Sequence, residues 1–512
     1  MRRPLPLFLL LLLAGCRIAD DAEFFRVTDR QVDALIASAP GPERSMAREI
    51  ASSDLPRERA PAVVKLDAVG GVNLALKANR KLLETIEKAF LARIDSELAE
   101  SRYWPILQPF TVSSSMTDSS DSARSREEAA SVGISQRLPL GGSVDFTGTG
   151  SAERVSGAET YKLTPAVGVT IPLWKGAGLA VTYNDLLDAA ASARYATREL
   201  EHFKQVLVID IVRQYFSLLQ QRKSIANLEK SLENARKLRN QSDALYRFGR
   251  VTKTELFRAE YQQTQAENDL LNAAENLKIA EDIFKLELAL PPETTLELAE
   301  EGSDYLPVAI DETAYIDSVR EGNILWRNTQ ERFEESKRHL SIAARELDPQ
   351  LDLTGKYSAV ESSEDLLKNY ESDPETWSAM LALKLPLDRK PLRTTYRHAV
   401  ISYLQDERSF ARSRDELVRQ ARLKTIGVRQ SELNVRLQKR GVEVAEKALK
   451  LLNYEYRQGK VANRDVIEAQ NRLIAAQNAL LRSLVEAKIS QLELKQLAGG
   501  LAIDEEGTWL KK

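Results

Sequence analysis

Apolar residues recur at alternating spacings of three and four positions in the later part of each half of the chain. Such residues run from Leu256 to Phe284, and again from Val435 to Tyr456 and from Val466 to Leu480. This is the heptad spacing of helical coiled coils. Alanine is frequent at these positions, which predicts helices that approach closely along a narrow seam. Because such a seam stabilises an isolated protomer poorly, we expect further helices to come from other chains.

Two lone glycines mark reversals between the helical stretches. Gly249 and Gly459, which lie 210 positions apart, each interrupt a helical pattern, and such a glycine suits the left-handed conformation that ends a helix. Thr252 and Asn463 follow three or four residues later, and we expect each to cap the next helix. The pattern predicts two antiparallel helical hairpins, over about 184–290 and about 396–498.

A second pair of anchors shows that the same plan occurs twice. Asn79 lies 26 residues before Pro105, and Asn323 lies 26 residues before Pro349. In the first interval we expect one helix from about Val72, which proline ends. The two asparagines are 244 positions apart, against 210 for the glycines. The chain is therefore predicted to hold two repeats, the first longer than the second.

Alternating polar and apolar residues follow each proline and predict β-strands, over about 106–172 and about 350–386. Two additional alternating runs flank Gly141-Gly142 and predict an extra hairpin in the first region. The first repeat would then have four strands and the second two, with connectors such as Thr117 to Ser125. We expect these strands to join those of other chains in a closed membrane barrel. The alternative is a small soluble β-subdomain.

The N-terminus is typical of an exported protein. Two arginines precede an apolar run from Leu7 to Leu13, which is too short to span a bilayer and predicts a signal peptide. The run ends in Leu13-Ala14-Gly15-Cys16, which resembles the processing box of bacterial lipoproteins and implies cleavage before Cys16 and its acylation, palmitate included. Cys16 is the only cysteine, so no disulfide can form within the chain, and Arg17 after it favours the outer membrane. The alternative is an ordinary signal peptide with a chance cysteine.

These features predict the organisation of the whole chain. No segment after the signal peptide reaches 18 consecutive apolar residues, so we expect no transmembrane helix in the mature protein. The expected parts are a signal peptide (1–15), a lipidated tether (16–65), a first repeat (66–290), a linker outside the helical barrel (291–309), a second repeat (310–500) and a tail (501–512).

The charge balance and the polar residues argue against several functions. The 512 residues include 72 Lys and Arg against 75 Asp and Glu, interspersed as on solvated helix faces, which argues against a nucleic-acid partner. His202, His339 and His398 are scattered without the spacing of metal ligands. The sequence contains no P-loop, dinucleotide-binding fingerprint or nucleophile elbow. We therefore expect no enzymatic activity, no metal and no cofactor apart from the covalent lipid at Cys16.

The doubled plan resembles the TolC-like outer-membrane efflux family over roughly residues 66–500. The motifs that carry the resemblance are Thr170-Ile171-Pro172-Leu173, Leu385-Pro386-Leu387, Tyr456-Arg457-Gln458-Gly459 and Asp465-Val466-Ile467-Glu468-Ala469-Gln470. The resemblance implies a mixed fold of α-helices and membrane β-strands. In the implied fold, a homotrimer forms one β-barrel that continues into a long α-helical coiled-coil barrel. The extra hairpin leaves open whether the barrel has twelve or eighteen strands.

The resemblance also implies roles for individual residues. The glycine turns would lie at the periplasmic tip, where an adaptor protein and an inner-membrane pump dock. Asp465 and Glu468 match an acidic pair that lines the tunnel constriction, and Glu255 matches an acidic position after the first turn. Threefold symmetry would stack such carboxylates into acidic rings; the alternative is that they are solvated near a helix start. Val461 replaces an arginine that closes the tip in the family's prototype, so Lys460 or Arg464 is expected to serve there.

The function that these expectations favour is an outer-membrane channel. It would passively conduct substrates from an inner-membrane pump and a periplasmic adaptor to the exterior, while anchored in outer-membrane lipid. One alternative is the exit duct of a type I protein-secretion system, which has the same fold. Another is a periplasmic coiled-coil lipoprotein that acts as a scaffold.

Overall fold

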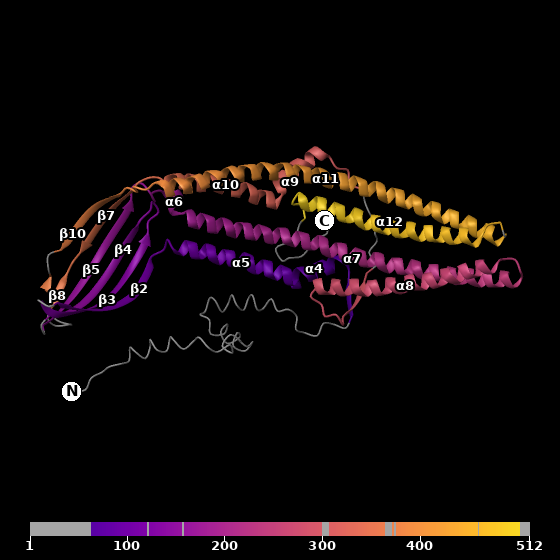
Figure 1. The fold of residues 1–512 in the computed structure, drawn as a ribbon, viewed down its shortest axis with the longest axis horizontal. Coiled ribbons are helices and arrows are strands. Elements are labelled where there is room, and N and C mark those ends of the chain that lie inside the picture. The colour runs from indigo at the N-terminus through magenta and orange to yellow at the C-terminus, as the bar shows by residue number, and fades with distance from the viewer. Residues whose placement is uncertain are drawn as a thin grey trace, which may run out of the picture. The chain divides into compact units, whose positions relative to one another are not determined.

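The computed structural model describes residues 63–119, 122–155, 158–299, 307–363, 371–372, 375–458 and 460–501. The chain divides into two units, Met1–Pro61 and Ala62–Lys512, and all the described residues belong to the second unit. The predicted signal peptide, Cys16, Gly459 and residues 502–512 lie outside the described residues. Figure 1 shows the described part of the second unit in colour.

Each repeat opens with two short helices rather than one. The helix expected from Val72 is interrupted at Asn79, whose extended backbone ends one helix and whose side chain accepts a 3.1 Å hydrogen bond from the Leu82 N–H of the next. Asn323 interrupts the second repeat in the same way and accepts from the Trp326 N–H. A side chain that caps a helix start satisfies an amide that otherwise lacks a partner. The four helices are α4 (Ala68–Ala78), α5 (Arg80–Ser101), α9 (Glu312–Gly322) and α10 (Ile324–Arg345).

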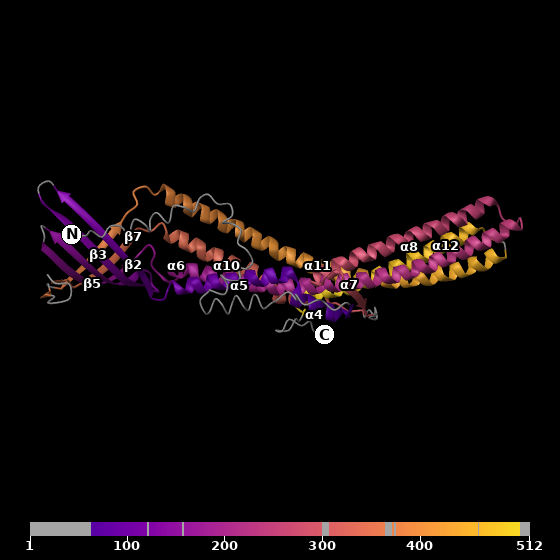
Figure 2. The ribbon, with the colours of Figure 1, turned by 90° about the horizontal axis from the view of Figure 1, so that it is seen from below.

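The two predicted helical hairpins are present. Neither proline nor glycine interrupts α7, which spans 64 residues, and the second long helix starts at Lys390, before the expected position 396. Both hairpins lie side by side at the end far from the sheet, where α12 contacts α7 (Figure 2). The hairpin helices are α7 (Asn184–Arg247) and α8 (Lys253–Glu287), then α11 (Lys390–Arg457) and α12 (Asn463–Leu497); a short α6 (Leu179–Thr182) precedes α7.

Eight of the described strands form one antiparallel sheet, whose main path is ordered β10-β7-β5-β4-β3-β2. The first repeat supplies four of the strands on this path and the second supplies two, as predicted; short β8 pairs with β5 and with β9 and was not predicted. The connector expected at Thr117 to Ser125 is shorter than that, because the ladder already pairs these two residues. The strands are β2 (Ile106–Ser119), β3 (Ser122–Arg137), β4 (Ser143–Val155), β5 (Ala158–Pro172), β7 (Gln350–Ser358), β8 (Glu361–Ser363), β9 (Glu371–Ser372) and β10 (Thr376–Lys384).

A small parallel pair of strands ties the linker to the start of the unit. Strand β1 (Val63–Leu66) pairs with β6 (Thr295–Leu298). The predicted tether included residues 63–65, and the predicted linker outside the helical barrel included residues 295–298. These residues form paired strands rather than a tether and a linker without regular structure. Leu296 and Leu298 are buried in the main core, because apolar side chains at alternate positions of a strand share one face.

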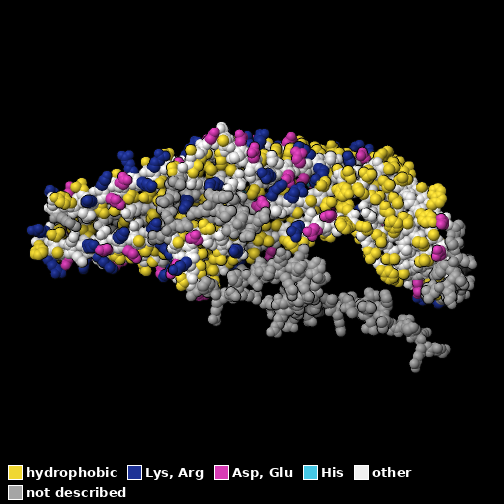
Figure 3. All heavy atoms as spheres, turned by 180° about the vertical axis from the view of Figure 1, so that it is seen from behind, with side chains coloured by type: hydrophobic (Ala, Val, Ile, Leu, Met, Phe, Trp, Pro, Cys, Tyr) yellow, Lys and Arg dark blue, Asp and Glu magenta, His cyan; other side chains and the backbone are white. Residues whose placement is uncertain are grey.

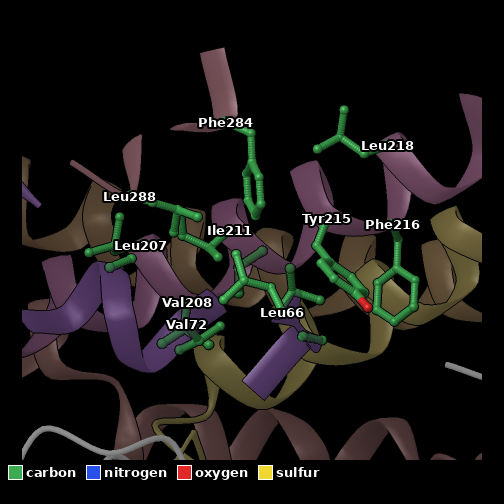
Figure 4. Packing of buried hydrophobic residues seen from close by; sticks show 14 of the residues in the cluster. Leu66, Val72, Leu207, Val208, Ile211, Tyr215, Phe216, Leu218, Phe284 and Leu288 are labelled. Carbon is green, nitrogen blue, oxygen red and sulfur yellow. The ribbon is translucent and has the colours of Figure 1, made fainter. Parts of the chain in front are cut away.

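The main core lies where the short helices meet α7 and the end of α8. Figure 4 shows Phe284 directed from α8 toward Ile211 of α7, with Leu66 of β1 nearby. Phe284, Tyr215 and Val72 are fully buried. The core therefore fixes the base of the first hairpin, and the sheet and the hairpin ends extend away from it (Figure 1).

Candidate functional site

The sheet has one apolar and one polar face. Paired residues in neighbouring strands point to the same side of a sheet, so the register defines each face directly. One row crosses all six long strands: Leu107, Ile134, Phe146, Val167, Tyr357 and Trp377. The row beside it, on the opposite face, reads Ile106, Ser135, Asp145, Gly168, Lys356 and Ser378.

The apolar face is uncovered. The exposed fraction is 79% for Trp377, 69% for Leu107 and 50% for Phe146, and Figure 3 shows hydrophobic side chains gathered over the sheet. Further apolar residues on this face of β5 reach from Leu163 to Ile171, a length of about 26 Å along the strand. That length is close to the height of about 25 Å of the apolar band on membrane barrels.

Both edges of this sheet are open. Strand β2 pairs only with β3, and β10 pairs only with β7, among the described residues. A long edge strand presents unpaired N–H and C=O groups to any further strand. Each edge can therefore accept a strand that this chain does not itself supply.

The tip of the first hairpin has the predicted conformation. Gly249 has a φ of 67°, and the Arg250 N–H donates a 2.9 Å hydrogen bond to the Leu245 carbonyl. Such a bond satisfies a carbonyl at the end of α7. Thr252 caps α8 and accepts from the Glu255 N–H at 3.4 Å. The partner glycine, Gly459, lies outside the described residues.

The tip of the second hairpin differs from the expectation. The residue that caps α12 is Ala462, and the Asp465 carboxylate accepts a 3.2 Å hydrogen bond from its N–H. Asn463 was predicted as the cap but is the first residue of the helix. Its buried amide instead donates to the Ser242 hydroxyl of α7 at 3.1 Å, so it joins the two hairpins.

Asp465 and Glu468 line one groove between α11 and α12. The groove has a volume of 740 Å³ and an apolar floor that includes Val444 and Ala469. Glu468 forms a 2.6 Å ion pair with Arg472 on the same helix, and Arg472 also lines the groove. The structure therefore brings the two predicted carboxylates together, with one of them paired to a cation.

The other predicted tip residues lie elsewhere. Glu255 and Lys460 line a separate cavity of 660 Å³ between the two hairpin ends, together with Arg250. Arg464 is exposed and lines neither this cavity nor the α11–α12 groove. Within one chain, Glu255 therefore does not share a groove with Asp465 and Glu468.

A network of ion pairs joins α7 to α10, and the sequence did not predict it. Glu331 accepts hydrogen bonds from Arg198 at 2.7 Å and from Arg194 at 3.3 Å. The hydrogen bond from Arg198 is the main reason that the pKa of Glu331 lies below its ordinary value. In the sequence these residues look like any charged positions on a solvated helix, so no signal distinguishes them.

The described residues contain neither a membrane-spanning helix nor a metal site. Among them, none of the helices combines the length and the apolar character needed to cross a bilayer. Within the same ranges, no group of three His, Cys, Asp or Glu side chains is arranged to hold a metal ion.

Comparisons with known proteins agree with this geometry. Residues 317–500 match the sequence model of a family described as outer membrane efflux protein. Nodulation protein T of Rhizobium leguminosarum bv. trifolii is 25% identical over 308 residues, which are 58% of this chain and 64% of that protein. This chain thus spans less than two thirds of that relative.

Solved outer-membrane channels share the fold. The Campylobacter jejuni CmeC channel matches with a TM-score of 0.64 and 15% identity, over 87% of each chain. VceC of Vibrio cholerae matches with a TM-score of 0.63 and 15% identity, over 84% of this chain and 95% of that one. The open state of the Neisseria gonorrhoeae MtrE channel gives 0.61 and 14%, over 85% and 90%. The predicted likeness to TolC-like proteins is confirmed.

Proposed function

Because residues 317–500 match the sequence model of the outer membrane efflux proteins, we propose that this chain belongs to that family and is the channel of a tripartite efflux or export system. Three copies would form one conduit, open to the exterior through the sheet and to the periplasm through the hairpins. A periplasmic adaptor and an inner-membrane pump would dock at the hairpin ends and supply the energy.

The two-faced sheet is the observation that carries this proposal. Burial of apolar area stabilises by about 25 cal/mol per Å², so side chains such as Trp377 and Leu107, left exposed on one chain, favour insertion into lipid. The opposite face, with Asp145 and Lys356, suits a water-filled interior. A soluble β-subdomain would need a covering layer over the apolar face, and no described element covers it.

The open edges support assembly from several copies. An edge inside a bilayer would leave backbone groups without partners, so membrane sheets close into barrels. With six long strands on the main path of the sheet, three copies would build an eighteen-stranded barrel. The lipid anchor at Cys16 remains a prediction from the sequence.

Conductance in planar bilayers tests the proposal directly. The full-length protein, purified in detergent, is expected to migrate as a heat-sensitive oligomer and to give uniform single-channel steps. A well-folded monomer without conductance would overturn the proposal and would favour a periplasmic scaffold. Protein heated until the oligomer is lost provides the matched control.

We also propose that Asp465 and Glu468 form the tunnel constriction, with Lys460 or Arg464 in contacts that close the tip. The variant Asp465→Asn with Glu468→Gln retains the shape of both side chains and removes their charge. Because the width of the constriction is unchanged, it is expected to lower cation preference without widening the tunnel. Glu443→Gln, an exposed position on α11, is the control. Unchanged selectivity in the double variant would remove this role.

A further inference from the structure

The last turns of α5 carry charges of the wrong sign for a helix end. Asp95, Glu97 and Glu100 are all exposed, and the last turn has no basic residue. The C-terminal end of a helix carries a partial negative charge, which disfavours carboxylates there. Glu97 has a partner on its own helix, Arg93, at 3.5 Å. Arg102, which caps this end of α5, lies 3.9 Å from Asp185 of α7. Among the described residues, no ion pair joins Asp95 or Glu100 to a cation, so the stability of α5 does not explain these two carboxylates.

The first turns of α11 show the reverse pattern. Arg389, Lys390, Arg393 and Arg397 are exposed, and the first turn has no acidic residue. The N-terminal end of a helix carries a partial positive charge, which disfavours cations. Arg389 donates to the Leu347 carbonyl at 3.3 Å. Within the described ranges, no ion pair joins Arg393 or Arg397 to another residue.

These two helix ends adjoin the two open edges of the sheet. Helix α5 leads into edge strand β2, and edge strand β10 leads into α11. Strand β2 runs away from the helices and β10 runs toward them. A β2 strand placed beside the β10 strand of another copy would therefore be antiparallel, as every pair in this sheet is.

We propose that the acidic end of α5 binds the basic end of α11 in a second copy of this chain. The inference rests on the proposed assembly of several copies. It identifies the surfaces through which neighbouring copies contact each other. Attraction between the opposite charges at the two helix ends would offset the unfavourable interaction of each set of charges with the dipole of its own helix. Exposed apolar residues continue each surface and would pack across it: Leu91 and Leu98 on α5, and Ile401 and Leu404 on α11.

The contact is directional. It joins two different surfaces, so each copy offers one acidic and one basic end, and repetition closes a ring where the rotation between copies returns to the first one, as closure of the barrel requires. It also opposes mispairing, because β2 beside β2 or β10 beside β10 would bring like charges together. The helix ends thereby select which strand edges meet.

Charge reversal tests the inference. One variant carries Asp95→Lys and Glu100→Lys, a second carries Arg393→Glu and Arg397→Glu, and a third combines all four changes. Each of the first two is expected to lower the fraction of detergent-resistant oligomer about tenfold, and the third is expected to restore it. A control with Arg436→Glu and Lys439→Glu makes the same charge change on an exposed part of α11 far along the helix and should assemble normally.

Four results would overturn the inference, each in a different way. Loss of oligomer in both single-surface variants without recovery in the combined one would show that the charges do not meet. Intact oligomers with weaker binding to vesicles of anionic phospholipid would assign the basic end of α11 to the membrane surface. A monomeric wild-type protein without conductance would remove the proposed function as well, whereas a conducting oligomer that ignores the reversals removes this inference alone.

Discussion

The side-chain amide of Asn323 donates a 3.0 Å hydrogen bond to the backbone carbonyl of Leu497, the last residue of α12. Asn79 makes the equivalent bond to the carbonyl of Glu287, the last residue of α8, at 2.8 Å. Each asparagine also caps the helix that follows it. One buried side chain in each repeat therefore joins the start of one helix to the end of another.

Replacement of Asn323 by Ala removes both bonds at once. Loss of the cap costs about 1 kcal/mol, and a buried carbonyl without a partner costs about 1–3 kcal/mol. We expect the free energy of unfolding of Asn323→Ala to fall by roughly 2–3 kcal/mol, measured by denaturant titration of the purified protein. Asn240→Ala, at an exposed position of α7, is the control, and equal effects of the two would contradict the double role.

The first hairpin tip requires glycine because of its backbone conformation and not because neighbouring atoms crowd the position. A Cβ at Gly249 would meet no atom within 4 Å, but φ is 67°. Gly249→Ala should therefore destabilise by about 1–2 kcal/mol through backbone strain alone. Gly427→Ala, in the interior of α11 and equally uncrowded, should stabilise by about 0.5–1 kcal/mol. Thermal unfolding of both variants checks the prediction, and effects of the same sign would refute it.

Adjacent residues on β4 should respond oppositely to the same substitution. Phe146 lies on the apolar face, with Ile134 and Val167, whereas Thr147 lies on the polar face, with Gly133 and Ala166. An arginine on a lipid-facing position costs about 2–4 kcal/mol near the middle of the bilayer. We expect Phe146→Arg to reduce the amount of folded protein in outer-membrane extracts and Thr147→Arg to leave it near the wild-type level. The opposite ranking would show that the lipid-facing side of the sheet is the polar one.

Acid should destabilise the unit partly through Glu331. Its hydrogen bond from Arg198 holds its pKa below the ordinary value of 4.5, so its contribution is complete above that pH. The contribution is lost as the pH falls through the lower pKa of the folded state. Glu331→Gln should therefore lose less stability than the wild type between about pH 5 and pH 3.

The measurement for Glu331 is the unfolding midpoint as a function of pH. Glu334→Gln is the matched control, because Glu334 pairs with Lys337 one turn along the exposed side of α10, at 2.7 Å. A parallel pH dependence in Glu331→Gln and the wild type would contradict the role of the Arg198 hydrogen bond.

The long elements could be predicted because they depend on local chemistry. Proline ends α5 before β2, and glycine reverses the chain after α7, whatever surrounds them. The sheet could be predicted because alternation over many residues indicates a strand. The positive φ of Gly249 follows from the same reasoning and is confirmed.

The features that the sequence did not reveal depend on distant partners. The break at Asn79 has no clear local signal, because asparagine is only mildly unfavourable within a helix and its bond to Glu287 joins residues far apart in the chain. Strands β1 and β6 have four residues each, too few for a clear alternation. Asn463 was predicted as a cap because asparagine after a turn commonly caps a helix. No local pattern indicates that its amide instead binds the distant Ser242.

The main core has a consequence for the order of events during biosynthesis. It joins Leu66, Leu296 and Leu501, so residues from the beginning, the middle and the end of the unit must all be present before it closes. Contacts so distant along the chain make folding slow. A nascent chain therefore cannot complete its central packing until Leu501 has been synthesised.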